Sequence, residues 1–317
     1  MRTAALVSAT AFWALAACTP GTAAPASTPG QPDRVSAGVI AIVDVAPIYL
    51  GKQKGFFSKR DIDLTLETSQ GGAAIVPGVL GGQYQFGFSN VTSLILAKSR
   101  GLPVKMVCNG VASTGAIGQD FGGVVVKAGS PIKTAADLTG RTVAVNTLKN
   151  IGDTTIRASV RKAGGDSKAV KFVEMAFPDM AAALQAGRVD AIWVVEPFLT
   201  IAKSQGGQVV AWNFVDAGPD LTIAAYFTSQ QILAGNPGLV QRFREAMAES
   251  LRYANEHPEE VRTVLGNYTQ IAPDVAAKMT LPMWPDSVNT TSVRALADLA
   301  VDDGLLDEAP NLTELLP

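Results

Sequence analysis

The polar and ionisable residues of this sequence point to the binding of a small molecule rather than to catalysis. The chain of 317 residues has one histidine, His257, and two cysteines. It carries no Cys/His cluster with metal-ligand spacing, no phosphate-binding G-x-x-x-x-G-K-S/T motif and no G-x-S-x-G nucleophile elbow. No acid and base are spaced to suggest a reaction. We therefore expect no catalytic residue, no metal site and no cofactor.

Glu196 is the acid best placed to hold a ligand. It ends the apolar run Ala191–Val195 and precedes Pro197. A carboxylate at a strand end can accept hydrogen bonds from an amino or hydroxyl group of a ligand, and Trp193 or Tyr226 could supply a flat apolar wall. The alternative is a structural carboxylate near the start of the next helix, stabilised by the helix dipole.

Three polar or glycine-rich turns in the first third of the chain follow strand-like segments, such as Ile62–Leu66 with its apolar–polar alternation. Asp44 in the first turn could cap the next helix or face a ligand. The glycines of the second turn would let the backbone approach another group closely, or would form only a tight turn. The third turn offers a hydroxyl and an amide, which suit a cap, a ligand or both. The ligand contacts that we predict in these turns are Asp44, Ala46, Gly71, Gly72, Ser89 and Asn90.

Two later segments add candidate contacts. The turn Asn146–Asp153 opens a predicted helix, whose first backbone N–H groups suit an anion. Asp153 already occupies that positive end, which argues against a strongly anionic ligand, whereas Lys149 argues for one, so the charge of the ligand stays open. The other segment is the loop 109–122, which contains several glycines. From these two segments we predict ligand contacts at Gly115, Asn146, Asn150 and Gly152.

The elements that must position these residues are strands separated by helix-length segments, so the sheets should be mostly parallel. In open sheets of this kind, ligands bind beyond the carboxyl ends of the strands. The length suits two lobes of about 100 to 150 residues each. We predict an α/β fold of two lobes, each a mostly parallel sheet flanked by helices. We assign residues 36–124 and 224–317 to lobe 1 and residues 125–223 to lobe 2.

The N-terminus has the features of an export signal. Arg2 precedes the apolar stretch Thr3–Ala17, which is short for a membrane span. Leu15–Cys18 resembles a bacterial lipoprotein cleavage box, in which the cysteine is lipidated (palmitate) and anchors the chain to the membrane. We predict a signal peptide over residues 1–17 and a lipidated Cys18 followed by a flexible tether to residue 35. An ordinary signal peptide with an incidental cysteine is the alternative.

The charge of the chain argues against a nucleic-acid partner, and its hydropathy argues against a membrane-spanning helix after the N-terminus. The formal net charge is −2 and there is no basic run, so we expect no nucleic-acid partner. After the N-terminus, no apolar run approaches the roughly 20 residues that a spanning helix needs.

The motifs together resemble a known family over roughly Val39–Gly207. The chain is similar to the substrate-binding proteins of bacterial ABC importers, in the branch that includes aliphatic-sulfonate, nitrate, taurine and thiamine-precursor (pyrimidine) binding proteins. The motifs that carry the resemblance are Gly51–Phe57, Gln70–Gly72, Gly101–Lys105, Ser130–Lys133, Ala136–Arg141, Ala186–Ala191 and Glu196–Phe198.

The resemblance implies a type II periplasmic-binding-protein fold, in which two lobes joined by two crossing strands close over a ligand. It implies an extracytoplasmic monomer that is held at the cell membrane by Cys18 and delivers its ligand to an ABC permease. In pyrimidine-binding relatives an acid and aromatic rings hold the heterocycle, roles that Glu196 and Trp193 could fill. Two alternatives are a sensor subunit that presents ligand to a receptor, and an enzyme like the fungal thiamine-pyrimidine synthases. Those enzymes use a histidine and a cysteine-rich segment, and this chain has neither at a matching place.

Overall fold

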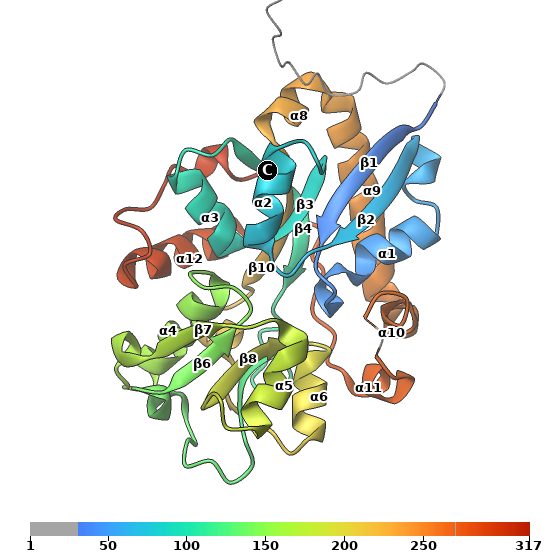
Figure 1. The fold of residues 1–317 in the computed structure, drawn as a ribbon. Helices are drawn as coiled ribbons and strands as arrows, with labels where there is room; N and C mark the ends of the chain where they lie inside the picture. The colour runs from blue at the N-terminus through green and yellow to red at the C-terminus, as the bar shows by residue number, and fades with distance from the viewer. Residues whose placement is uncertain (1–30, 270) are drawn as a thin grey trace, which may run out of the picture.

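The computed structural model describes residues 31–269 and 271–317, which form two β-sheets flanked by helices (Figure 1). The first sheet has the strand order β2-β1-β3-β10-β4, and the second has the order β7-β6-β8-β5-β9. The strands of the first sheet are β1 (Asp33–Val39), β2 (Ile62–Thr68), β3 (Phe86–Asn90), β4 (Val104–Ala112) and β10 (Thr222–Ser229). Those of the second are β5 (Gly122–Val126), β6 (Thr142–Val145), β7 (Lys171–Glu174), β8 (Ala191–Val195) and β9 (Gln208–Ala211). The predicted α/β architecture of two lobes is confirmed.

The helices of each lobe come from the same parts of the chain as the strands of its sheet. Between β5 and β10 the chain forms α4 (Ile151–Lys162), α5 (Phe177–Gln185), α6 (Phe198–Ser204) and α7 (Asn213–Ala217). Before β4 it forms a short 3-10 helix η1 (Val43–Val45), then α1 (Ala46–Gln53), α2 (Gly72–Leu80) and α3 (Val91–Ser99). After β10 it forms α8 (Gln230–Gly235), α9 (Pro237–Glu256), α10 (Pro258–Leu265), α11 (Pro273–Lys278) and α12 (Thr290–Asp302).

Parallel pairing brings the polar turns to a common edge of each sheet. β1 runs parallel to both β2 and β3, and β6 runs parallel to both β7 and β8. The turns after β1, β2 and β3 therefore leave the first sheet from the same edge. β10 is antiparallel to its neighbours, as is β5. The chain passes to the second sheet between β4 and β5 and returns between β9 and β10. The exact lobe boundaries stay predictions, and β1 begins at Asp33, inside the range assigned to the tether.

Long helix α9 holds the first lobe together through an apolar stripe. Its residues at helical spacing, among them Phe243, Met247 and Leu251, are completely buried. The Phe243 ring stacks on Phe86 of β3, with ring centroids 3.7 Å apart. Full burial of one such side chain contributes about 1.5–3 kcal/mol, so this stripe fixes the helix on the sheet that carries the polar turns.

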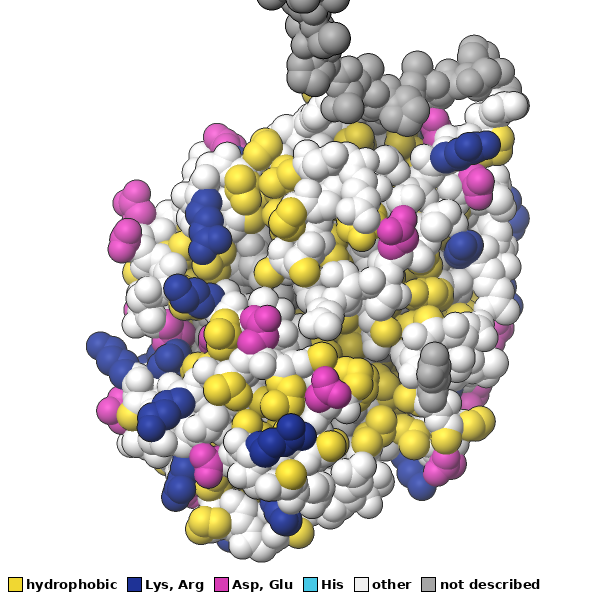
Figure 2. Space-filling model, in the orientation of Figure 1, with side chains coloured by type: hydrophobic (Ala, Val, Ile, Leu, Met, Phe, Trp, Pro, Cys, Tyr) yellow, Lys and Arg dark blue, Asp and Glu magenta, His cyan; other side chains and the backbone are white. Residues whose placement is uncertain are grey.

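The visible surface mixes both signs of charge. On the face drawn in Figure 2, basic and acidic side chains are interspersed, and hydrophobic side chains appear along the junction between the two lobes. Within residues 31–269 and 271–317, no helix combines the length and the apolar character needed to cross a membrane. The predicted signal peptide, Cys18 and most of the tether lie outside the described residues.

Candidate functional site

The turns at the strand ends of the two lobes meet each other. The Val43 backbone N–H, in the turn after β1, donates to the Glu196 carbonyl at 3.1 Å. The Asn146 side-chain amide, in the turn after β6, donates to the Gln70 carbonyl at 3.4 Å. Turns of the first sheet thus lie directly against turns of the second, and the described state is one in which the lobes touch.

In the first lobe the second and third turns pack without a gap. A Cβ atom on Gly72 would lie 2.2 Å from the Ser89 hydroxyl oxygen and 2.6 Å from the Ser89 Cα. Only glycine fits this approach, which agrees with a close backbone contact, one of the two alternatives that the sequence left open. The Asn90 side chain accepts a hydrogen bond from the Ser93 backbone N–H at 2.9 Å and so caps α3. Of the two roles that we considered for Asn90, a helix cap and a ligand contact, the structure shows the helix cap.

Asp44 does not cap the first helix, and that interpretation is wrong. Helix α1 begins at Ala46, which is fully buried, and its N-terminal cap residue is Val45, without a side-chain capping bond. The Asp44 side chain is 3% exposed, and its Oδ1 has no hydrogen-bond partner among the described residues. Asp44 therefore retains an acceptor that the rest of the described chain does not use.

The pKa of the Asp44 carboxyl is raised, and burial is the main cause. Desolvation raises the pKa of this carboxyl to about 7, its own backbone N–H opposes the shift, and the negative charge of Asp120 adds to it. Asp120, in the passage to the second lobe, accepts hydrogen bonds from the Ser113 hydroxyl at 2.7 Å and the Thr114 backbone N–H at 3.0 Å. Burial raises the pKa of Asp120 as well. The charge of one buried acid thus adds to the pKa shift of the other, and neither acid belongs to an ion pair in the part of the chain that the structure describes.

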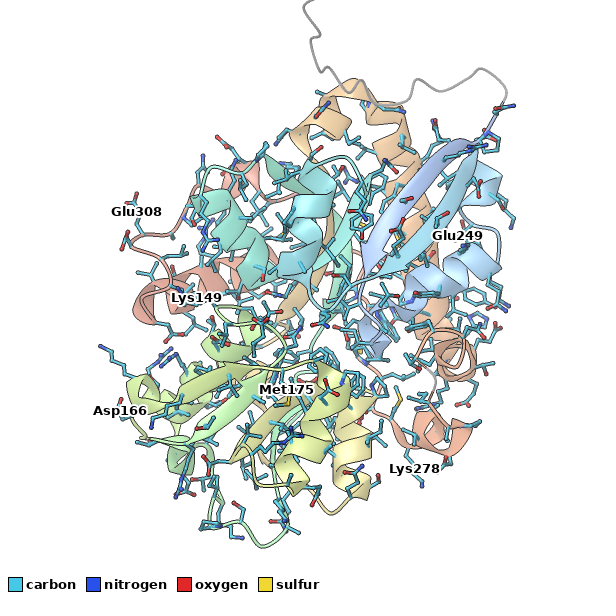
Figure 3. All side chains as sticks on the ribbon, viewed as in Figure 1. Lys149, Asp166, Met175, Glu249, Lys278 and Glu308 are labelled. Carbon is cyan, nitrogen blue, oxygen red and sulfur yellow. The ribbon has the colours of Figure 1, made fainter. Side chains whose placement is uncertain are left out.

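In the second lobe, a chain of hydrogen bonds orders the turn before α4. The Asn150 amide donates to Asn146 Oδ1 at 3.0 Å, and Asn150 Oδ1 accepts from the Gly152 N–H at 2.9 Å. Asp153 Oδ2 accepts from the Lys149 N–H at 2.8 Å, and burial raises the pKa of Asp153 to about 6. Figure 3 shows Lys149 at the junction of the lobes, where its side chain is exposed. The structure thus brings Asn146, Asn150 and Gly152 together at the junction.

Trp193 lies behind this turn. A Cβ on Gly152 would lie 2.7 Å from the Trp193 ring, so the glycine allows the turn to sit on the indole. Phe177 and Phe214 pack on the same ring, with centroids 5.8 Å and 5.9 Å away. The ring is 3% exposed, and its Nε1 donates to no described residue. Trp193 therefore supports the turn and keeps one buried donor unused.

The Glu196 carboxylate is held within the chain. Its Oε2 accepts from the Thr200 backbone N–H at 2.9 Å and its Oε1 from the Thr200 hydroxyl at 2.8 Å. A third bond, at 3.3 Å, comes from the Thr280 backbone N–H, which lies after α11. Burial raises the pKa of Glu196, and the bonds from Thr200 and Thr280 oppose that shift. This geometry favours a structural role for Glu196 over a ligand contact. The sequence did not indicate the hydrogen bond from Thr280 in the C-terminal part of the chain.

Two predicted contacts come from segments other than the junction turns, although the charge of Asp44 is one of the causes that raise the pKa of the Tyr226 hydroxyl. Tyr226 is fully buried in β10, against Phe88 and Phe243 of the first lobe. Burial raises the pKa of its hydroxyl well above the usual value, and this hydroxyl finds no partner within the described ranges. Gly115 lies in the passage between β4 and β5 with φ of +72°, and a side chain there would meet open space. Their role as ligand contacts stays a prediction.

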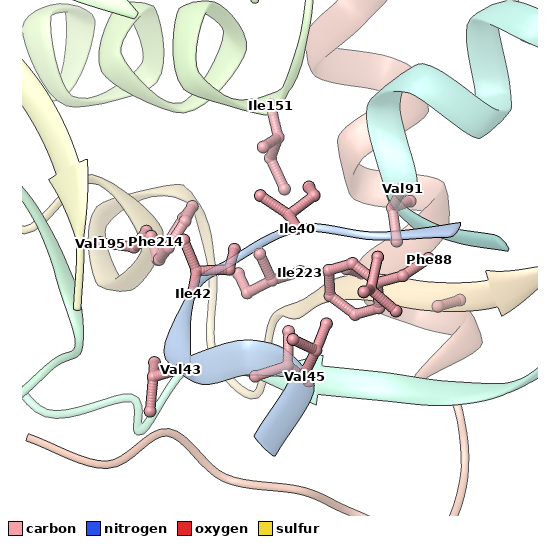
Figure 4. Close-up of a cluster of buried hydrophobic side chains, with 14 of the residues drawn as sticks. Ile40, Ile42, Val43, Val45, Phe88, Val91, Ile151, Val195, Phe214 and Ile223 are labelled. Carbon is pink, nitrogen blue, oxygen red and sulfur yellow. The ribbon is translucent and has the colours of Figure 1, made fainter. Parts of the chain in front are cut away.

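The walls between the lobes are apolar. Figure 4 shows buried aliphatic and aromatic side chains from both lobes converging, with Ile40 and Val91 from the first and Ile151 and Val195 from the second. A separate cavity of about 370 Å³ lies between β4 and α9 and includes Cys108 and Arg244. It contains none of the predicted contacts, so we place the candidate site at the junction of the turns.

Sequence reasoning missed several residues of this junction. Asp120, Thr280 and Trp284 reach it only through the tertiary fold, and the Trp284 indole N–H donates to the Asp44 carbonyl at 3.1 Å. The one available signal was an acid near the end of the loop 109–122, at Asp120. Among the described residues, no group of three or more His, Cys, Asp or Glu side chains is arranged to hold a metal.

Replacing Gly71 with alanine should keep the lobes apart. The Gly71 backbone is extended, with φ of −171°, so alanine adds no backbone strain. Its Cβ would lie 2.5 Å from the Thr147 hydroxyl of the other lobe, and such overpacking costs about 1–3 kcal/mol. We expect a larger radius of gyration in small-angle X-ray scattering.

The variant Gly71→Ala/Thr147→Ala is the matched control, since it removes the nearest clashing atom and should restore the wild-type radius. An unchanged radius in Gly71→Ala alone would show that this contact does not limit closure.

Comparisons of the sequence with known proteins identify a family and relatives. The sequence pattern of the family described as "NMT1/THI5 like" matches residues 42–261. A formylaminopyrimidine-binding protein of Halalkalibacterium halodurans is 23% identical over 221 residues, which make up 69% of this chain and 64% of that protein. The match therefore spans less than two thirds of that relative.

Solved structures share the two-lobe fold. The zinc-bound ligand-binding component of an ABC-type import system from Staphylococcus aureus matches with a TM-score of 0.78 and 14% identity, covering 90% of this chain and 97% of that one. The periplasmic aliphatic sulphonate binding protein from Escherichia coli matches with a TM-score of 0.71 and 19% identity, covering 90% and 98%. The predicted periplasmic-binding-protein fold is confirmed.

Proposed function

We propose that this chain, which belongs to the NMT1/THI5-like family, is the extracytoplasmic solute-binding subunit of an ABC importer. The observation that carries the proposal is the meeting of polar turns from both lobes, at Val43 with Glu196 and at Gln70 with Asn146. Turns so placed can close over a solute by a hinge motion and release it when the lobes part. The fold shared with import-system proteins supports the same function.

The rest of the proposal follows from this role. The chain binds its ligand without covalent chemistry and passes it to a membrane permease. We propose that it acts as a monomer and is anchored through the lipid on Cys18, whose tether would raise the effective concentration near the permease. The predicted contacts in the junction turns remain our candidates for ligand binding.

The buried charges at the junction favour a neutral or cationic ligand with an apolar body, whereas Lys149, the cation placed there, is exposed. Asp44 and Asp120 are buried acids that lack an ion-pair partner in the described ranges. Asp44, whose pKa is about 7, is ionised in part of the molecules at neutral pH, and in that form it would repel an anion in a poorly screened site. A donor N–H or an ammonium group would satisfy the free oxygen of Asp44. The apolar walls of Figure 4 would cover the rest of such a molecule.

A thermal-shift screen of the purified protein tests both the function and the ligand class. The panel holds nitrate and methanesulfonate as anions, aminopyrimidines as neutral molecules, and alkylamines as cations. A ligand at 100 times its dissociation constant should add about 2.7 kcal/mol of stability. We expect a neutral or cationic compound to raise the melting temperature, and Asp44→Asn to bind it at least about tenfold more weakly, a loss of roughly 1.4 kcal/mol.

The exposed acid Asp298 supplies the matched control, since Asp298→Asn should bind as the wild type does. Binding of anions alone would overturn the ligand class while supporting a solute-binding role. If neither this panel nor a broad metabolite library shifts the melting temperature, the solute-binding function itself is contradicted.

A further inference from the structure

The C-terminal part of the chain crosses from one lobe to the other a third time, in addition to the two passages between the sheets. Thr280 donates from its backbone to the Glu196 carboxylate of the second lobe. Three residues later, Met283 and Ala112 exchange backbone hydrogen bonds of 2.9 Å and 3.1 Å at the end of β4. This segment therefore joins the end of β8 to the end of β4.

Helix α12 makes a second bridge further along the same segment. It packs against α3 of the first lobe and against α4 of the second. At its C-terminal end, Asp303 forms an ion pair with Arg161, which lies in the last turn of α4. In Figure 1, α12 lies beside the lower lobe next to α4. The ion pair thus ties the two lobes on the side of the junction where α12 and α4 meet.

The environment of this ion pair makes it sensitive to lobe separation. The Asp303 side chain is 1% exposed, whereas the Arg161 side chain is 33% exposed. Arg161 is also held within its own lobe, where it donates to the Ser167 hydroxyl at 3.4 Å. When the lobes part, Asp303 must lose this partner and regain water. With the lobes together and Arg161 removed, the buried carboxylate would lose its ion-pair partner, which is unfavourable even though Arg157 of α4 also acts on its charge.

We propose that the segment Thr280–Asp303 is a clasp that holds the two lobes together, with Arg161 and Asp303 as positioning residues that set the balance between closed and open forms. Neither residue belongs to the junction turns, so the clasp acts on ligand affinity through the fraction of closed molecules. This consequence rests on the proposed solute-binding function, whereas the effect on lobe separation does not. If Arg161→Met lowers the closed fraction tenfold, it weakens ligand binding about tenfold as well.

Small-angle X-ray scattering of the ligand-free protein tests the clasp. Arg161→Met should increase the radius of gyration, because it leaves Asp303 buried without its partner. Arg161→Met/Asp303→Leu removes both charges and should return the radius to the wild-type value. The rescue is the diagnostic result, since a residue that merely stabilises α4 would not be rescued by a change on α12.

Lys162→Met is the matched control. Lys162 is the next residue along α4, but it pairs with Asp216 of its own lobe at 3.1 Å, so its loss should leave the radius unchanged. Circular dichroism verifies that each variant is folded. Should Arg161→Met fail to fold, Asp303→Asn keeps the packing and weakens the pair, with a smaller increase expected. A wild-type radius in every folded variant, or an equal increase in Lys162→Met, would overturn the clasp whether or not a ligand is known.

Discussion

Replacing Glu196 with alanine should lower the free energy of unfolding by roughly 3 kcal/mol, one of the largest effects of a single substitution in this chain. The carboxylate is 1% exposed and accepts three hydrogen bonds, two from Thr200 and one from Thr280. Without it, the buried N–H groups of both residues lose their partner, and each unsatisfied group costs about 1–3 kcal/mol. Urea denaturation at pH 7 measures the loss.

The control for this prediction is Glu308→Ala, since Glu308 is exposed and should change the stability by less than about 0.5 kcal/mol. Thr200→Val measures the contribution of the hydroxyl hydrogen bond alone, because it removes the hydroxyl donor and leaves the backbone N–H of residue 200 bonded to Glu196. A loss below about 1 kcal/mol in Glu196→Ala would show that water replaces the carboxylate and that the hydrogen bonds to it are not structural.

Asp44→Asn should stabilise the protein at alkaline pH. Burial raises the pKa of Asp44 from 3.8 to about 7, so between these values the folded chain keeps a proton that the unfolded chain has released. The carboxyl therefore subtracts stability as the pH rises, by roughly 1.4 kcal/mol per pH unit and roughly 4 kcal/mol in all. Below pH 4 both states are protonated and this contribution vanishes.

The measurement is the difference in unfolding free energy between Asp44→Asn and the wild type from pH 4 to pH 8. We expect this difference to grow in favour of the variant as the pH rises. Asp298→Asn removes a carboxyl that is exposed instead of buried and serves as the matched control. A flat difference in Asp44→Asn would mean that Asp44 ionises normally, and the free acceptor that we assign to the ligand would then be solvated.

The strand ends could be predicted because they follow from local patterns. The alternation in Ile62–Leu66 gave β2, and the polar pair Ser89–Asn90 marked the end of β3. Parallel pairing then had to bring the turns to one edge. A close approach at Gly72 was one of two alternatives for this turn, and the sequence did not show that the neighbour is Ser89. That contact depends on how two strands are ordered in the sheet.

The roles of the two acids could not be predicted in the same way. Asp44 has the spacing of a helix cap, yet the chain enters α1 through Val45 and leaves the carboxyl buried, where the charge of Asp120 adds to its pKa shift. Glu196 has the spacing of a ligand contact, yet Thr280, 84 residues further along the chain, donates to it. In both cases the outcome depends on which distant segment packs against the side chain.

By itself, the sequence determined the alternation of strands and helices, the position of each polar turn and hence the two-lobe fold, because hydrophobic periodicity and turn residues act over a few neighbouring positions. The tertiary structure alone decided which polar groups are satisfied within the chain and which are left free, and it alone paired Arg161 with Asp303. The physical reason is that desolvation and hydrogen bonding depend on groups brought together from distant parts of the chain.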